Sequence, residues 1–308
     1  MRIYKKAILP LGFKANGISA GIKRSGKPDL GLVYSEKLAN AAAVFTTNKF
    51  AAAPVQVSKA LLKRNKLFHG IVVNSGNANC FTAAAGLKKA KLMSEVAAKN
   101  LASGRESVLV ASTGIIGKQL DVKKIVSAMP GLVKGLSCSG INRFSQAILT
   151  TDKFRKEISA KLDMNGKKIT LCAVCKGAGM IAPNMATMLC FIFTDLAIEK
   201  SSLKQALKIA VADSFNSISV DGCQSTNDTV LILANGKAGN KPLTNKSKDY
   251  AKFLKALHLV CLELAKMIVK DGEGATKIIQ LDVVGAKTKE EAKKVGLVVA
   301  NSNLFKTA

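Results

Sequence analysis

Short apolar runs alternate with longer amphipathic stretches along most of the 308 residues. An apolar run of about four to eight residues that ends in Gly, Asn or Ser is typical of a buried strand followed by a loop. On this criterion the sequence predicts strands at 70–79, 107–117, 168–179, 188–196, 229–236 and 277–286.

Helical periodicity fills much of the space between these runs. In residues 201–218, apolar side chains recur every fourth position, beginning at Leu203, and so share roughly one helix face. Asp121 is a plausible N-cap for one of the helices. The helices are predicted at 83–102, 121–135, 201–218 and 248–270. Strands and helices in alternation predict a mixed α/β fold built in layers.

The chain carries a formal net charge of +27, which calls for anionic partners. Only six of its 47 basic residues are Arg, the lysines are scattered, and Trp is absent. Nucleic-acid readers rely on Arg forks and stacked aromatic rings, so this composition does not favour a nucleic-acid partner. We expect a solvated Lys-rich surface that attracts small carboxylates.

Other classes are disfavoured by what the sequence lacks. No apolar run approaches the roughly 20 residues needed to cross a bilayer, and the first residues do not form a signal peptide, so we expect a cytoplasmic protein. The seven cysteines show no regular framework. Cys172 and Cys175 form one CxxC, but no second pair completes a zinc set, so no metal site is expected.

The stretch KGAGMIAPNMATMLCFIFTDL, residues 176–196, places Thr187 where small residues meet an apolar strand. A Thr becomes a nucleophile through a neighbouring base, or through its own α-amine once the chain is cut before it. His69 and His258 are the only histidines and are expected to be structural, which disfavours a Ser-His-Asp type of site. An α-amine has a pKa of about 7.7–8.0, which suits a general base.

Oxyanion donors for such a nucleophile must come from another loop. The motif ASTGIIG offers the Thr113 hydroxyl and backbone N–H groups beside the sterically open Gly114. The alternative is that ASTGIIG is an ordinary strand-to-helix turn. Considered without the other motifs, ASTGIIG favours this alternative.

Several motifs together carry a resemblance. In order along the chain they are LPLGFKANGISAGIKRSGKPDLGLVYSE, VNSGNAN, ASTGIIG, AILTTD, KGAGMIAPNMATML, SVDGCQSTNDTVLILANG and DGEGATK. The sequence is similar to the ornithine acetyltransferase family, also called arginine biosynthesis bifunctional protein ArgJ. The resemblance implies a layered α/β/β/α sandwich and transfer of an acetyl group from N2-acetylornithine to glutamate, without a bound cofactor. Some members also accept acetyl-CoA as donor.

Members of this family cleave themselves before a Thr. The resemblance places the cut between Ala186 and Thr187, giving an α chain, 1–186, and a β chain, 187–308, that share one core. Thr187 would then carry the acetyl group, and two α and two β chains would assemble. Members usually continue beyond the segment that corresponds to NSNLFKTA, so the sequence is expected to be C-terminally truncated.

The resemblance also implies roles for other residues. Thr113 and Gly114 correspond to the oxyanion hole, and Thr150, Lys176 and Glu273 to substrate contacts. A cation at Lys176 suits the α-carboxylate that both amino acids share, and Glu273 suits the ammonium of ornithine. The polar blocks VNSGNAN and STND either brace the site or form turns.

Two other functions are compatible with these residues. An amidohydrolase or aminopeptidase on the same scaffold would pass the acyl group to water instead of glutamate. A truncated, inactive scaffold would remain uncut and bind nucleic acid through its lysines, with a steep salt dependence.

Overall fold

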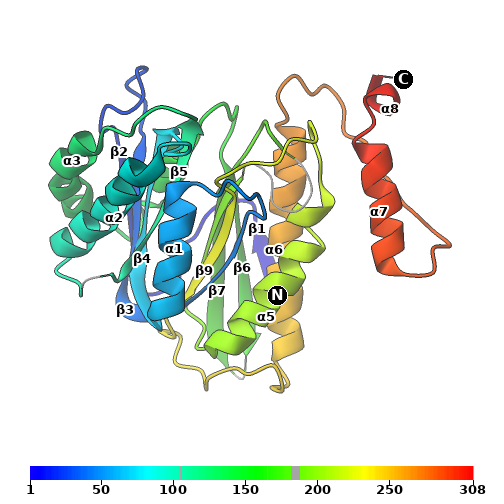
Figure 1. The fold of residues 1–308 in the computed structure, drawn as a ribbon. Helices are drawn as coiled ribbons and strands as arrows, with labels where there is room; N and C mark the ends of the chain where they lie inside the picture. Colours follow the sequence, from blue (N-terminus) through cyan, green and yellow to red (C-terminus); the bar gives the residue numbers. More distant parts are fainter. Residues whose placement is uncertain (105, 165, 182–187, 308) are drawn as a thin grey trace.

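Nine strands form a mixed sheet in the parts of the chain that the computed structural model describes, residues 1–104, 106–164, 166–181 and 188–307 (Figure 1). The strand order is β1-β6-β7-β8-β9-β3-β4-β5, with β2 pairing with β3 beside this path. The pairs β4/β5 and β8/β9 are parallel, and the others are antiparallel. The strands are β1 (Arg2–Tyr4), β2 (Phe13–Ile18), β3 (Leu30–Phe45), β4 (Leu67–Asn77), β5 (Val108–Ile115), β6 (Lys156–Met164), β7 (Lys167–Lys176), β8 (Leu189–Thr194) and β9 (Thr229–Ala234).

Helices flank the strands on two sides, as Figure 1 shows: α1, α2 and α3 lie beside β2 to β5, and α5 and α6 lie on the opposite side. The helices are α1 (Ala53–Arg64), α2 (Ala83–Asn100), α3 (Val122–Lys134), α4 (Ile141–Ala147), α5 (Lys200–Ala212), α6 (Tyr250–Lys270), α7 (Lys289–Ala300) and α8 (Asn303–Thr307). This layered α/β arrangement confirms the predicted fold class. None of the helices in the described ranges has the length and hydropathy needed to cross a bilayer.

Strand β3 joins the two halves of the sheet. Residues 30–34 pair with β2 and β4, and residues 40–45 pair with β9. The register between β3 and β4 shifts between Tyr34 and Ala39, and such a bulge bends a strand and increases its twist. One long strand therefore belongs to both the α1–α3 side and the α5–α6 side of the molecule.

Strict alternation along β8 separates two hydrophobic clusters. Cys190 and Ile192 face the cluster of α5 and α6, whereas Phe191 and Phe193 face the cluster that contains α1 to α4. The ring of Phe144 in α4 lies 5.6 Å from that of Phe191 in an edge-to-face arrangement. Both faces of β8 are therefore buried, which explains its continuous apolar sequence.

Most predicted elements are present, with three differences. The predicted helix 201–218 ends at Ala212, and a separate 3-10 turn follows at Phe215–Ser217. Asp121 occupies the N-cap position of α3, but its side chain makes no capping hydrogen bond. The predicted strand 277–286 is not a strand, and Ile278, Ile279 and Val284 are exposed. Alternating apolar residues form a strand only when another strand is available to pair with them.

Helices α7 and α8 contribute no buried residue and stand apart from the other helices in Figure 1. They contact the body of the molecule through polar groups. Lys293 Nζ donates to the Ala212 carbonyl at 2.7 Å, and Lys306 Nζ donates to the Val220 carbonyl at 2.7 Å. The candidate site does not depend on hydrophobic packing from this segment.

Candidate active site

One cavity of about 1110 Å³ brings together residues that are far apart in the sequence. Thr113, Gly114, Thr150, Lys176 and Glu273 all line it, and each was singled out from a motif. Ala186 and Thr187, the predicted cleavage pair, lie outside the described residues.

Gly114 occupies a position that only glycine fits. Its φ is +132°, and a Cβ atom there would lie 2.4 Å from the carbonyl carbon of Gly76. Gly76 and Gly114 are register partners at the ends of the parallel strands β4 and β5. Thr113, immediately before Gly114, is buried. The backbone of β5 therefore reaches the cavity with no side chain at Gly114 to cover it.

A buried amide network fixes this strand end. Asn227 Nδ2 donates to the Ala78 carbonyl at 2.7 Å and to the Ser112 carbonyl at 2.8 Å. Ser112 Oγ donates to Asn74 Oδ1 at 2.6 Å, and Asn74 Nδ2 donates to the Asn77 carbonyl at 2.9 Å. Segments VNSGNAN and STND are thus both hydrogen-bonded to Ser112, the residue before Thr113. Thr113 and Gly114 directly follow Ser112 in β5, the strand that this network holds. Their donor groups therefore need little reorganisation when charge develops on a bound carbonyl oxygen.

Lys176 supplies a buried cation at the end of β7. Burial lowers the pKa of its ammonium, and the nearby Asp152 carboxylate opposes that shift. The Lys176 Nζ lies 4.0 Å from Asp152 Oδ2, beyond hydrogen-bond length. Asp152 therefore supports the charge of Lys176 without engaging it in a short hydrogen bond.

Asp152 also belongs to a fully buried ion triad that the sequence did not predict. Lys156 Nζ donates to Asp152 Oδ1 at 2.7 Å and to Asp271 Oδ2 at 2.6 Å. Asp152 further accepts hydrogen bonds from the backbone N–H of Thr150 at 3.0 Å and of Gly177 at 2.7 Å. The triad therefore ties the Thr150 loop and the end of β7 to the end of α6.

Glu273 reaches the cavity from the loop after α6. Its backbone N–H donates to the Ala178 carbonyl at 2.8 Å. A Cβ atom on Gly179 would lie 2.6 Å from the Glu273 carboxyl carbon, so a side chain at this position would displace the carboxylate from where it now lies. The cavity consequently presents a cation, Lys176, and an anion, Glu273.

A further buried carboxyl, that of Asp228, lies beside the chain segment that follows Thr187. Asp228 Oδ1 accepts a hydrogen bond from the backbone N–H of Met188 at 2.9 Å, and Oδ2 has no hydrogen-bond partner among the described residues. Burial raises the pKa of Asp228 well above its usual range, against the opposing effects of the Met188 N–H and the Lys176 ammonium. The carboxyl is thus hydrogen-bonded to Met188, the residue that follows Thr187 in the sequence, and its buried environment favours the protonated acid.

The residues considered for metal or histidine chemistry lie elsewhere. Cys172 and Cys175 are buried in opposite clusters, as expected for i and i+3 on a strand, and burial raises the pKa of each thiol to about 12. Neither His69 nor His258 is among the described residues that line the cavity. In the described parts of the chain, no three His, Cys, Asp or Glu side chains are grouped to hold a metal ion.

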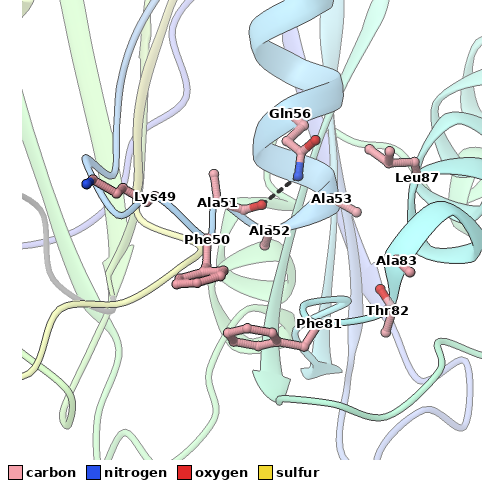
Figure 2. A pocket seen from close by; sticks show the side chains of 10 residues that line it. All are labelled: Lys49, Phe50, Ala51, Ala52, Ala53, Gln56, Phe81, Thr82, Ala83 and Leu87. Atoms are coloured by element: carbon pink, nitrogen blue, oxygen red, sulfur yellow. Dashed lines mark hydrogen bonds between the residues drawn. The ribbon is translucent and has the colours of Figure 1, made fainter.

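A smaller cavity of about 460 Å³ lies at the beginnings of α1 and α2 (Figure 2). The exposed rings of Phe50 and Phe81 lie 5.5 Å apart at its edge, and Gln56 Nε2 donates to the Ala51 carbonyl at 2.7 Å. None of the residues that were predicted for catalysis and that the structure describes lines it.

Comparison with known proteins assigns the chain to one family. The model of the ArgJ family matches residues 14–308. The chain belongs to the ArgJ family. It is 47% identical over 303 residues to the "Arginine biosynthesis bifunctional protein ArgJ" of Caldanaerobacter subterraneus subsp. tengcongensis, covering 98% of this chain and 75% of the relative.

Two further ArgJ-family comparisons extend this result. The "Glutamate N-acetyltransferase" of Methanocaldococcus jannaschii is 48% identical over 304 residues, covering 97% of this chain and 73% of the relative. The crystal structure of ornithine acetyltransferase from Mycobacterium tuberculosis, complexed with ornithine, superposes with a TM-score of 0.55 at 33% identity, covering 59% of this chain and 97% of that chain. The sequence resemblance is thereby confirmed.

Proposed function

We propose that this ArgJ-family protein is a glutamate N-acetyltransferase of arginine biosynthesis, which moves an acetyl group from N2-acetylornithine to glutamate. The observation that carries the proposal is the single cavity that collects Gly114, Lys176 and Glu273. Acyl transfer between amino acids requires a donor for the oxyanion and charged groups that bind the substrates. The open backbone at Gly114 suits the first role, and the cation Lys176 and the anion Glu273 suit the second. The names of the relatives supply the substrates.

The chemistry begins with the chain cut between Ala186 and Thr187. The new α-amine takes the proton of the Thr187 hydroxyl while its oxygen attacks the acetyl carbonyl of N2-acetylornithine. The oxyanion is stabilised by the Thr113 hydroxyl and the Gly114 backbone N–H. The tetrahedral intermediate expels ornithine, whose amine takes the proton back, and leaves an acetyl ester on Thr187.

The second half of the cycle reverses these steps. The amine of glutamate attacks the ester carbonyl, and the Thr187 oxygen leaves and regains a proton. Lys176 binds the α-carboxylate that both amino acids share, Glu273 binds the side-chain ammonium of ornithine, and Thr150 contacts the substrate. Acetyl-CoA would act as an alternative donor to the same hydroxyl, and the cycle needs no bound cofactor.

The two products of cleavage, 1–186 and 187–308, are proposed to stay associated as α and β chains in an assembly of two copies each. Strand β7 belongs to the first and pairs with β8 of the second over six register pairs. Both hydrophobic clusters also draw residues from each side of the cut. This shared core supports one folded unit after cleavage.

The test is the intact mass of the purified protein beside a Thr187→Ala variant. We expect fragments that end at Ala186 and begin at Thr187 in the parent, and one uncut chain in the variant. Acetyl transfer is then measured with N2-acetylornithine and glutamate. An uncut parent would contradict the proposal, and release of acetate without glutamate would identify a hydrolase instead.

A further inference from the structure

Lys23 is a half-buried lysine on the wall of the large cavity; it lies within the first of the quoted motifs, but the sequence assigned it no role. Its position is fixed by Asp29, which is completely buried. Asp29 Oδ1 accepts from the Ala20 N–H at 2.6 Å, and Oδ2 accepts from the N–H groups of Ile22 at 2.6 Å and Lys23 at 2.9 Å. Three charge-assisted hydrogen bonds from one loop to one carboxylate make that loop a preformed wall.

The stem of Lys23 lies against the strand end that presents the oxyanion backbone. A Cβ atom on Gly76 would lie 2.9 Å from Lys23 Cγ, and Gly76 is the register partner of Gly114. Among the described residues, the Lys23 ammonium has one hydrogen-bond acceptor, the Pro28 carbonyl at 2.7 Å. An ammonium has three protons, so two remain for a ligand in the cavity.

The two amino acids of the proposed reaction differ in their side chains. Ornithine ends in an ammonium and glutamate in a carboxylate, yet both must present an amine to the same acetyl group. Lys176 accounts for the shared α-carboxylate and Glu273 for the ammonium of ornithine. Glutamate carries a second carboxylate in its side chain. Binding that carboxylate therefore needs a cation in addition to Lys176.

We propose that Lys23 binds the side-chain carboxylate of the acceptor and thereby selects glutamate for the second half of the cycle. The inference rests on the proposed function. Lys23 has no role in the attack of Thr187 on N2-acetylornithine, so its removal affects the acceptor and not the donor.

The charges around Lys23 give the proposal a pH signature. Burial lowers its pKa to about 8; Asp29 and Asp152 oppose the shift, while Lys176 and Lys27 add to it. The ammonium is present below that pKa and is lost as pH rises through about 8. Binding of glutamate is therefore expected to weaken above pH 8.

The experiment compares Lys23→Met with the parent in both half-reactions. Loss of one charged hydrogen bond is expected to raise KM for glutamate about 10- to 100-fold. The burst of ornithine from N2-acetylornithine, measured without glutamate, is expected to be unchanged. Lys27→Met is the matched control, because it removes an exposed lysine from the same loop that does not line the cavity.

Lys23→Arg tests the pH signature, since a guanidinium stays charged throughout. KM for glutamate is expected to rise more steeply above pH 8 in the parent than in this variant, because only the Lys176 ammonium, whose pKa burial also lowers, still titrates in both. Equal KM values for glutamate in the parent and Lys23→Met, or a parallel loss of the ornithine burst, would overturn the role of Lys23. A parent with no ornithine burst would overturn the proposed function itself.

Discussion

The ionised form of Asp152 is expected to stabilise the folded protein, and Asp152→Asn measures by how much. The carboxylate is fully buried and meets Lys156, Lys176 and two backbone N–H groups. Asparagine keeps the shape of the side chain but carries no charge. It therefore resembles the protonated acid while leaving Lys156 paired with Asp271.

The magnitude follows from the pKa. Burial alone would raise the pKa of Asp152, but Lys176, Lys156 and the Gly177 N–H lower it from 3.8 to about 2. At about 1.4 kcal/mol per pKa unit, this shift corresponds to about 2.5 kcal/mol of stability at pH 7. Because the folded pKa is depressed, the contribution is complete above the unfolded pKa and disappears as pH falls through about 2. At pH 3 about half of it remains.

The assay is urea unfolding of the parent and Asp152→Asn at pH 7 and pH 3. The difference in free energy of unfolding is expected to be about 2.5 kcal/mol at pH 7 and roughly half that at pH 3. Asp163→Asn, which removes an exposed carboxylate of β6, is the control and should show no measurable loss at pH 7. A deficit of equal size at both pH values would show that packing, and not ionisation, accounts for it.

Two predictions concern the oxyanion strand. Gly114→Ala places a Cβ atom 2.4 Å from the Gly76 carbonyl carbon, so acetyl transfer, measured as kcat, is expected to fall by about 10²- to 10³-fold, and an unchanged kcat would contradict the role of this backbone. Asn227→Leu leaves the Ala78 and Ser112 carbonyls without their buried donor, so urea unfolding should show a loss of about 1–3 kcal/mol, with unaltered stability as the contrary result.

The hydrophobic pattern of the sequence predicted those strands and helices whose apolar residues match the faces that are buried in the fold. β8 is apolar on both faces, and α6 carries a continuous apolar stripe, so both could be read from the sequence. β3 was not predicted, because Ala39–Ala43 has weak strand propensity and is held in the sheet by its pairing with β9. The segment 277–286 shows the opposite failure, with strand-like residues and no partner strand.

The site residues that could be predicted differ from the others in the sequence around them. Gly114, Lys176 and Glu273 stand in motifs whose small residues signal close backbone approach. Lys156 lies outside the motifs, and Lys23 lies inside one without an assigned role, because a lysine in a Lys-rich chain resembles a solvated surface residue. The partner of Lys156 at Asp271 is 115 residues away, and only the tertiary fold reveals that contact.

The net charge of +27 and the selectivity of the cavity act at different ranges. Surface lysines attract any small carboxylate, but at physiological salt their field is screened beyond about 8 Å and does not distinguish glutamate from other acids. Inside the cavity, burial reduces screening, and two of the lysines have a defined carboxylate nearby: Asp152 beside Lys176, and Asp29 beneath the loop of Lys23. On this proposal the basic surface attracts anionic substrates to the protein. The choice among them depends on Lys176 and Lys23, which Asp152 and Asp29 hold in place.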